Sequence, residues 1–79
     1  MSNREKYDQA FIECFQVGKA QLSDKLVYQS VATWDSVGHM TLIAALESVF
    51  DIQMEMDDII DFSSYTKGIE TLSKYKVAI

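Results

Sequence analysis

Length, composition and charge already exclude several classes of protein. The chain has 79 residues, enough for one domain; 48% are hydrophobic and 24% charged, which excludes disorder by composition. The net charge of −5 argues against a nucleic-acid ligand, and a single cysteine, Cys14, excludes an intramolecular disulfide and a cysteine metal cluster.

The first predicted element is a helix from about Arg4 to Val17. Ser2 or Asn3 caps its start, and Gly18 is expected to stop it. Its apolar stripe has helical spacing and is made of Tyr7, Ala10, Phe11, Cys14 and Phe15. We interpret Cys14 as a small core residue within this stripe, in preference to a reactive thiol.

Residues 19–34 predict a long loop, since their apolar side chains follow no sustained period. Those side chains, Leu22, Leu26, Tyr28, Val31 and Trp34, are expected to pin the loop to the domain, with a helical turn near Ser23 to Leu26. A structureless loop of this length is unusual in a compact domain and is often functional.

The next helix is expected to start at Asp35 and Ser36 and to end near Phe50 or Asp51, with Asp35 as its N-cap. Its core face holds His39, Leu42, Ile43, Leu46, Val49 and Phe50. A second stripe places Val37, Met40 and Ala44 beside Ser36 and Glu47. Three exposed apolar residues are common on surfaces, so this stripe is either incidental or a contact patch.

Two shorter elements complete the chain. Asp57 to Asp61 predicts a short helix, with Ile59, Ile60 and Phe62 turned inward. A last helix is expected from Tyr65 to about Lys76, capped by Ser63 or Ser64. Gly68 within it costs about 1 kcal/mol relative to Ala, and a close helix crossing is its expected reason.

Charge is unevenly distributed along these elements. No Lys or Arg lies between Leu26 and Thr66, whereas seven acids do: Asp35, Glu47, Asp51, Glu55, Asp57, Asp58 and Asp61. Such acids either keep a small protein soluble or form a docking surface for basic partners. The segregation favours docking.

Catalytic motifs are missing from the sequence. It has no glycine-rich phosphate loop, no calcium loop and no zinc-ligand pairing. Ser36 and His39 suggest a nucleophile and a base, but they point about 60° apart on a helix of 100° per residue. We therefore expect no enzyme activity, and a core or boundary role for His39.

The stretch from Trp34 to Leu42, with Asp35-Ser36-Val37, resembles the attachment motif of the acyl carrier protein family. A 14-residue helix and a long loop precede it, and Asp57-Asp58-Ile59-Ile60-Asp61-Phe62 and a helix with Gly68-Ile69 follow, so the resemblance covers nearly the whole chain. It implies an all-α, four-helix bundle of the acyl-carrier type, with a short third helix.

The resemblance also implies a function. Ser36 would carry 4′-phosphopantetheine, added by a phosphopantetheinyl transferase from coenzyme A with magnesium, and Asp35 would help to position that reaction. Acyl or aminoacyl groups would ride on the arm as thioesters. Acyl-loading and acyl-accepting enzymes with basic surfaces would dock on Val37, Met40, Ala44, Glu47, Asp57 and Asp58. The resemblance also implies that the cargo can enter between helices by parting Leu46, Phe50, Ile59, Phe62, Ile69 and Leu72; the alternative is a closed core with the cargo left in solvent.

The chain departs from many fatty-acid carriers after the serine, where acids are replaced by Gly38, His39 and Thr41. This favours a specialised carrier in a secondary-metabolite, surface-polysaccharide or aminoacyl pathway. The alternative is an unmodified helical interaction module.

Location and assembly are further expectations. No apolar run reaches the roughly 18 residues of a membrane span, and the N-terminus lacks a signal-peptide core. We therefore expect a cytoplasmic, monomeric, stand-alone domain covering residues 1–79.

Overall fold

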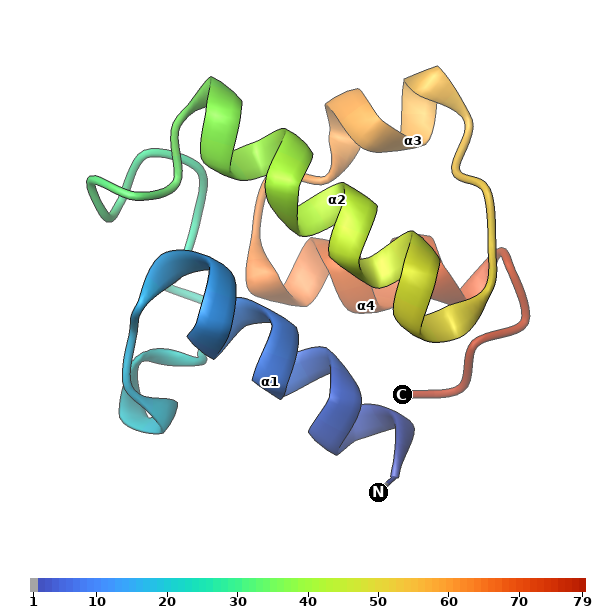
Figure 1. Ribbon diagram of the computed structural model, residues 1–79, viewed down its shortest axis with the longest axis horizontal. Helices are drawn as coiled ribbons and strands as arrows, with labels where there is room; N and C mark the ends of the chain where they lie inside the picture. Colours follow the sequence, from blue (N-terminus) through green and yellow to red (C-terminus); the bar gives the residue numbers. More distant parts are fainter. Residues whose placement is uncertain (1) are drawn as a thin grey trace.

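The computed structural model describes residues 2–79, which fold into four α-helices and one short 3-10 helix (Figure 1). The elements are α1 (Asn3–Phe15), η1 (Lys19–Gln21), α2 (Ser36–Phe50), α3 (Met56–Asp61) and α4 (Tyr65–Ser73). The prediction of an all-helical fold with a short third helix is confirmed. Within the described part of the chain, no helix has the length and apolar character needed to cross a membrane.

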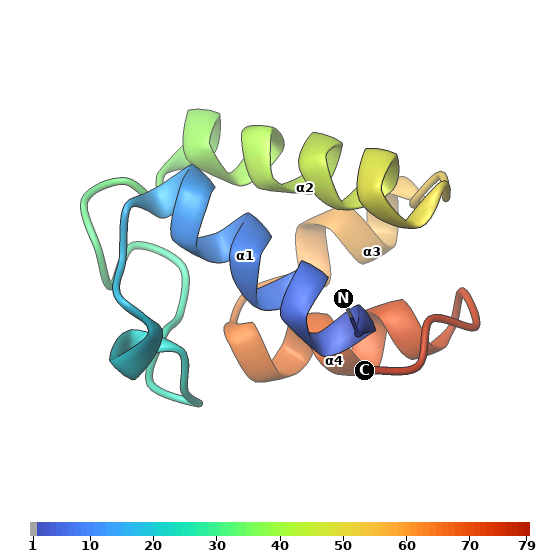
Figure 2. The ribbon, with the colours of Figure 1, turned by 60° about the horizontal axis from the view of Figure 1, so that its bottom comes forward.

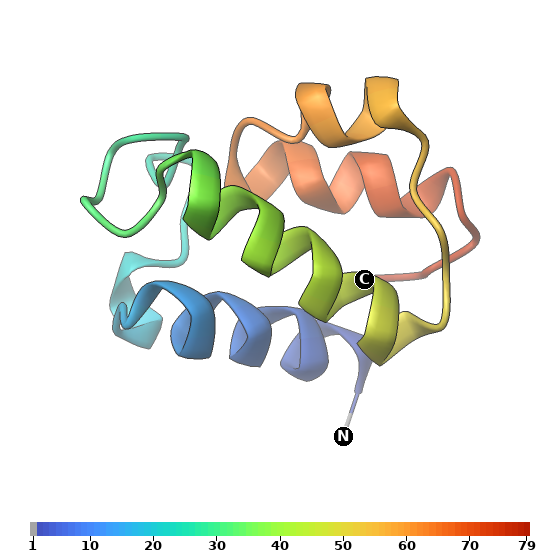
Figure 3. The same ribbon diagram turned by 45° about the horizontal axis from the view of Figure 1, so that its top comes forward.

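Helices α1 and α2 lie side by side and run in opposite directions, while α3 and α4 cover the other side of α2 (Figure 3). The view in Figure 2 places α4 opposite α2, with α1 beside both. The two ends of the chain meet, because the side-chain amide of Asn3 donates to the carbonyl of Ala78 at 3.1 Å.

Helix α1 begins as expected and ends earlier than expected. Ser2 and Glu5 form a reciprocal capping box at its start. Its end is at Phe15, because Gln16 takes a left-handed conformation with φ 56°. The prediction that Gly18 stops this helix is therefore wrong; Gly18 instead precedes η1 and donates its N–H to the side chain of Gln21 at 2.8 Å.

Aromatic rings form the centre of the core. Phe11 lies among the rings of Tyr7, Phe15, Trp34, Phe62 and Tyr65, all of which are buried. Such edge-on and stacked pairs add stability beyond the area that they bury. Cys14 is half-buried against this core, and burial raises the pKa of its thiol, in agreement with the core interpretation.

Two aromatic side chains pack directly against Gly68 in α4. A Cβ atom built there would lie 2.2 Å from the hydroxyl oxygen of Tyr7 and 2.3 Å from Cζ of Phe62. The glycine is therefore required by the packing of two aromatic side chains against α4, and the structure does not show the predicted close approach of two helices there. Helix α4 ends at Ser73 rather than Lys76, because the chain turns back and Lys76 takes a left-handed φ of 65°.

The loop between α1 and α2 is held at several points. A turn brings the N–H of Leu26 to the carbonyl of Ser23 at 3.0 Å, as expected, and Val27 forms an isolated bridge with Ser64. Leu26 and Trp34 are buried. Tyr28 is 36% exposed, yet its ring contacts those of Trp34 and His39, so it holds the loop to the domain as predicted.

Candidate functional site

Ser36 is the first residue of α2, and its side chain is exposed. Asp35 caps the helix: its Oδ1 accepts the N–H of Gly38 at 2.8 Å, and its carbonyl accepts the N–H of His39 at 2.8 Å. The predicted placement of Ser36 in an exposed first helical turn is confirmed. Its modification stays a prediction.

The start of α2 is packed tightly against the preceding loop at Gly38. A Cβ atom there would lie 1.9 Å from the carbonyl oxygen of Thr33 and 3.3 Å from Cε1 of Phe15. The hydroxyl of Thr33 in turn donates to the carbonyl of Phe15 at 2.7 Å. Only glycine fits at this close approach. The loop and the end of α1 therefore fix the position of the first turn of α2, which carries Ser36.

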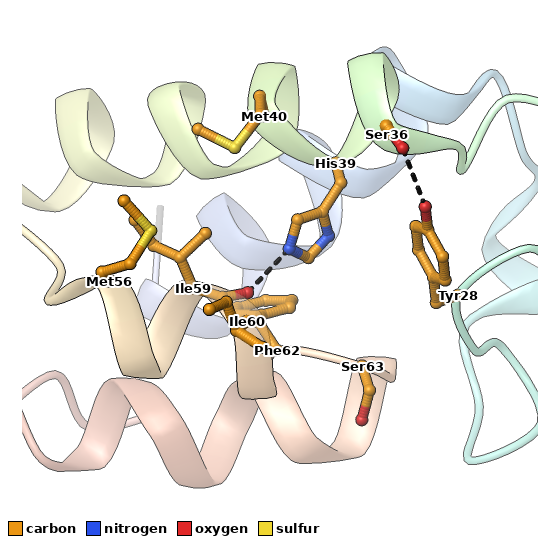
Figure 4. A pocket seen from close by; sticks show the side chains of 9 residues that line it. All are labelled: Tyr28, Ser36, His39, Met40, Met56, Ile59, Ile60, Phe62 and Ser63. Carbon is orange, nitrogen blue, oxygen red and sulfur yellow. Dashed lines mark hydrogen bonds between the residues drawn. The ribbon is translucent and has the colours of Figure 1, made fainter.

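Tyr28 is a site residue that the sequence did not reveal. Its phenol oxygen lies 3.2 Å from Oγ of Ser36 (Figure 4), and its ring meets those of Trp34 and His39 edge-on. Residues 28 and 36 are joined by an irregular loop, so no periodicity signals this contact.

A pocket of about 320 Å³ opens beside Ser36, between α2 and α3 (Figure 4). It is lined by Tyr28, Ser36, His39, Met40, Met56, Ile59, Ile60, Phe62 and Ser63. The lining is mostly apolar and contains no Lys, Arg, Asp or Glu. This is the composition of a small-molecule site that accepts an apolar ligand.

His39 extends from α2 toward α3 and uses both ring nitrogens (Figure 4). The indole N–H of Trp34 donates to Nδ1 at 3.0 Å, and Nε2 lies 2.7 Å from the carbonyl of Ile59. Because an indole N–H only donates and a carbonyl only accepts, the proton is on Nε2. His39 is half-buried at the edge of the core, as predicted, and neither nitrogen faces Ser36 as a free base.

The apolar stripe predicted on α2 is at the surface. Val37 is 76% exposed and Met40 52%, and Ala44 is also exposed. On α3, Met56 is 67% exposed and Ile60 68%, so the prediction that Ile60 turns inward is wrong. Met40, Met56 and Ile60 share the rim of the pocket (Figure 4), so three of the exposed apolar side chains are gathered beside Ser36. Val49, which was predicted on the core face, is instead 44% exposed near the other end of α2.

The structure gives two of the acids predicted to dock partners internal contacts instead. Oε2 of Glu47 accepts the N–H of Met54 at 2.9 Å and ties down the connection to α3. Asp58, 14% exposed at its side chain, pairs with Nζ of Lys74 at 3.0 Å and accepts the hydroxyl of Tyr75 at 2.5 Å. Of the two predicted acids on α3, Asp57 is therefore the accessible one.

These contacts shift the titration of the groups involved. The hydrogen bond from Tyr75, followed by the contact with Lys74, lowers the pKa of Asp58. The same contact raises the pKa of Lys74, and the bond to Asp58 raises the pKa of Tyr75. The contacts among Asp58, Lys74 and Tyr75 therefore hold α3 against the end of α4 while Asp58 is charged.

The six residues expected to part for a cargo lie mostly in the closed core. Leu46, Phe62 and Leu72 are fully buried, and Phe50, Ile59 and Ile69 pack against them. Only Ile59 and Phe62 of this set reach the pocket. The open volume therefore lies at the Ser36 end of α2, and not along the whole interior.

Among residues 2–79, no three His, Cys, Asp or Glu side chains are arranged to hold a metal ion. No protein-family model matches the chain, and no curated protein matches its sequence.

Proposed function

We propose that this protein is a carrier: Ser36 takes a 4′-phosphopantetheine arm, and acyl or aminoacyl groups ride on the arm as thioesters to partner enzymes. The observation that carries the proposal is an exposed serine hydroxyl at a helix N-terminus, at the mouth of an apolar pocket. A carrier needs only these two features, since its arm supplies the reach and its partners supply the catalysis.

The position of Ser36 suits a phosphodiester. The amide N–H groups of the first helical turn lack intrahelical acceptors, and the helix dipole favours negative charge at this end. Helix α2 has 15 residues, so its dipole is well developed. The Asp35 carboxylate shows that an anionic group is accepted at this helix end, since it accepts the N–H of Gly38.

The pocket suits the apolar part of a cargo. Its volume of about 320 Å³ lies at the lower end of the range for ligand sites, and Met40 and Met56 stand on its rim. Methionine side chains adapt to irregular partners because they are unbranched and flexible. Under this proposal, a short acyl chain rests between α2 and α3 while the core beneath it stays closed.

Partner enzymes would dock over the start of α2 and α3. The exposed side chains of Val37, Met40 and Ala44 offer the apolar centre, and Asp57 adds an accessible negative charge. The transferase and the acyl-handling enzymes would therefore present an apolar contact flanked by basic residues.

The test is the mass of the intact protein after incubation with a phosphopantetheinyl transferase, coenzyme A and magnesium. We expect one phosphopantetheine on the wild type and none on Ser36→Ala. Ser63→Ala is the matched control, because Ser63 lines the same pocket and is also exposed; it should load fully. No addition to the wild type, or addition that persists in Ser36→Ala, would contradict the proposal.

An unmodified interaction module is the second candidate, favoured by the uncharged surface after Ser36. Gly38 and Thr41 stand where many fatty-acid carriers have acids, and Met40 is exposed between them. Protein isolated only in the unmodified form from its native host, despite a competent transferase there, would support this candidate over the carrier.

A further inference from the structure

The side-chain oxygen of Ser36 has one hydrogen-bonding partner in the described part of the chain. That partner is the phenol of Tyr28, at 3.2 Å (Figure 4). The tyrosine ring also forms one wall of the pocket beside Ser36. Tyr28 therefore touches both features on which the proposed carrier function depends.

The backbone holds Tyr28 firmly in this position. Its own N–H donates to the carbonyl of Ser63 at 2.8 Å, and the preceding residue, Val27, bridges to Ser64. On the other side, the N–H of Gln29 donates to the carbonyl of Trp34 at 3.0 Å and closes the loop. These backbone bonds, together with the ring contacts to Trp34 and His39, hold Tyr28 in place without involving Ser36.

Modification of Ser36 would change the roles of the two hydroxyls. The serine oxygen bonds to the β-phosphorus of coenzyme A as the pyrophosphate P–O bond breaks, the adenosine bisphosphate leaves, and the serine proton passes to a base on the transferase. The product oxygen has no proton, and a phosphodiester only accepts hydrogen bonds. Of the two hydroxyls, only the phenol of Tyr28 can then donate, and a hydrogen bond to an anion is stronger than a neutral one.

We propose that Tyr28 is a positioning residue whose hydroxyl donates a hydrogen bond to the phosphodiester on Ser36 and thereby keeps the first link of the arm at the pocket mouth. The inference rests on the proposed function. The pocket lining offers no Lys or Arg for this purpose, and the amide N–H of Gly38 is already taken by the Asp35 carboxylate. A fixed neutral donor directs the arm toward the pocket rather than into solvent.

The first test is the phosphorus NMR resonance of the loaded protein. Tyr28→Phe keeps the ring against Trp34 and His39 and removes only the hydroxyl, so its phosphorus resonance should move from the wild-type position. Tyr65→Phe is the matched control, because it removes a phenol hydroxyl that bonds Asp8 and Arg4, away from the pocket. Its resonance should match the wild type.

The results distinguish a failure of the proposed carrier function from a failure of the role of Tyr28. A wild type that cannot be loaded overturns both. Proteins that load normally but give the same phosphorus resonance for wild type and Tyr28→Phe overturn the role of Tyr28 alone.

A second test uses only the wild type, so it does not depend on the folding of a variant. The Cζ carbon resonance of Tyr28 should shift when Ser36 is loaded, while those of Tyr7, Tyr65 and Tyr75 stay in place. A Tyr28 resonance that does not respond to loading would also overturn the inference.

Discussion

The two sides of this small domain are packed in opposite ways. At α4, the rings of Tyr7 and Phe62 pack so tightly on the backbone that Gly68 has no room for a methyl group. Where α2 faces α3, a pocket of about 320 Å³ stays open, and its rim includes Met40, Met56 and Ile60, each more than half exposed. Aromatic rings line both sides, and Phe62 belongs to both, but only the open side adds exposed, unbranched methionine side chains.

The contrast shows how a short chain divides its limited core. A domain of this size buries only about 60% of the surface that its unfolded chain exposes, so dense packing on one side must stabilise an open side elsewhere. The side that carries Ser36 is the open one. His39 joins the two, since it accepts from the buried Trp34 and donates to Ile59 on the pocket wall.

Gly68→Ala should have the largest effect, because it tests the closed side directly. Helix propensity alone would make this change stabilising by about 1 kcal/mol. The clash with Tyr7 and Phe62 outweighs that gain, and we expect a net loss of about 2 kcal/mol of unfolding free energy, measured by chemical denaturation.

Gly18→Ala is the matched control for this prediction. The nearest atom to a Cβ there is 3.8 Å away and its φ is −85°, so the variant should be neutral or stabilised by up to about 1 kcal/mol. Equal stability of the two variants would contradict the tight packing at Gly68.

His39→Ala should have the next largest effect, since it removes the hydrogen bonds that connect the closed side to the open side. The buried indole N–H of Trp34 and the carbonyl of Ile59 would lose their partner, at a cost of about 1–3 kcal/mol of unfolding free energy. Thr41→Ala, which removes only a bond to the carbonyl of Val37 within α2, should change stability by at most about 0.5 kcal/mol. A His39→Ala protein as stable as this control would show that the histidine is not structural.

Asp58→Asn tests how the open side is anchored. The bond from Tyr75 and the pairing with Lys74 lower the pKa of Asp58, so its contribution to stability is present above its unfolded pKa of about 3.9. That contribution is lost as the pH falls through the still lower folded pKa.

We therefore expect a modest loss of stability in Asp58→Asn at neutral pH, and a gap to the wild type that closes below about pH 4 in denaturation series. Asp57→Asn, on the exposed neighbour, should change stability little at neutral pH. A gap for Asp58→Asn that widens in acid would reverse the assigned direction of the shift.

The sequence could predict the helices and the exposure of Ser36, because both follow from local rules. The stripe containing Tyr7 and Phe11 has helical spacing, and Asp35 is a good N-cap wherever the chain lies. It could not predict that Gln16, and not Gly18, ends α1, because glycine preference is a tendency that tertiary packing overrides.

Long-range contacts account for the remaining differences. Glu47 and Asp58 looked like surface acids, but each meets a partner that the fold brings from elsewhere, the N–H of Met54 for one and the side chain of Lys74 for the other. Tyr28 reaches Ser36 for a similar reason, through a loop whose path depends on the bridge to Ser64. The spacing of residues in a sequence does not predict contacts that depend on the tertiary fold.

Val37→Ser should have the smallest effect on stability but a clear effect on docking. It therefore tests whether the open side binds partners without changing how that side is folded. Val37 is 76% exposed, so the unfolding free energy should change by no more than about 0.5 kcal/mol. If Val37 lies at the centre of the transferase contact, kcat/KM for loading should fall about tenfold, which corresponds to about 1.4 kcal/mol. Val49→Ser, at the other end of α2 and 44% exposed, is the matched control and should load at the wild-type rate. Equal losses in the two variants would mean that the contact is not centred on the Ser36 end of α2. The open side would then not be the surface on which the transferase docks.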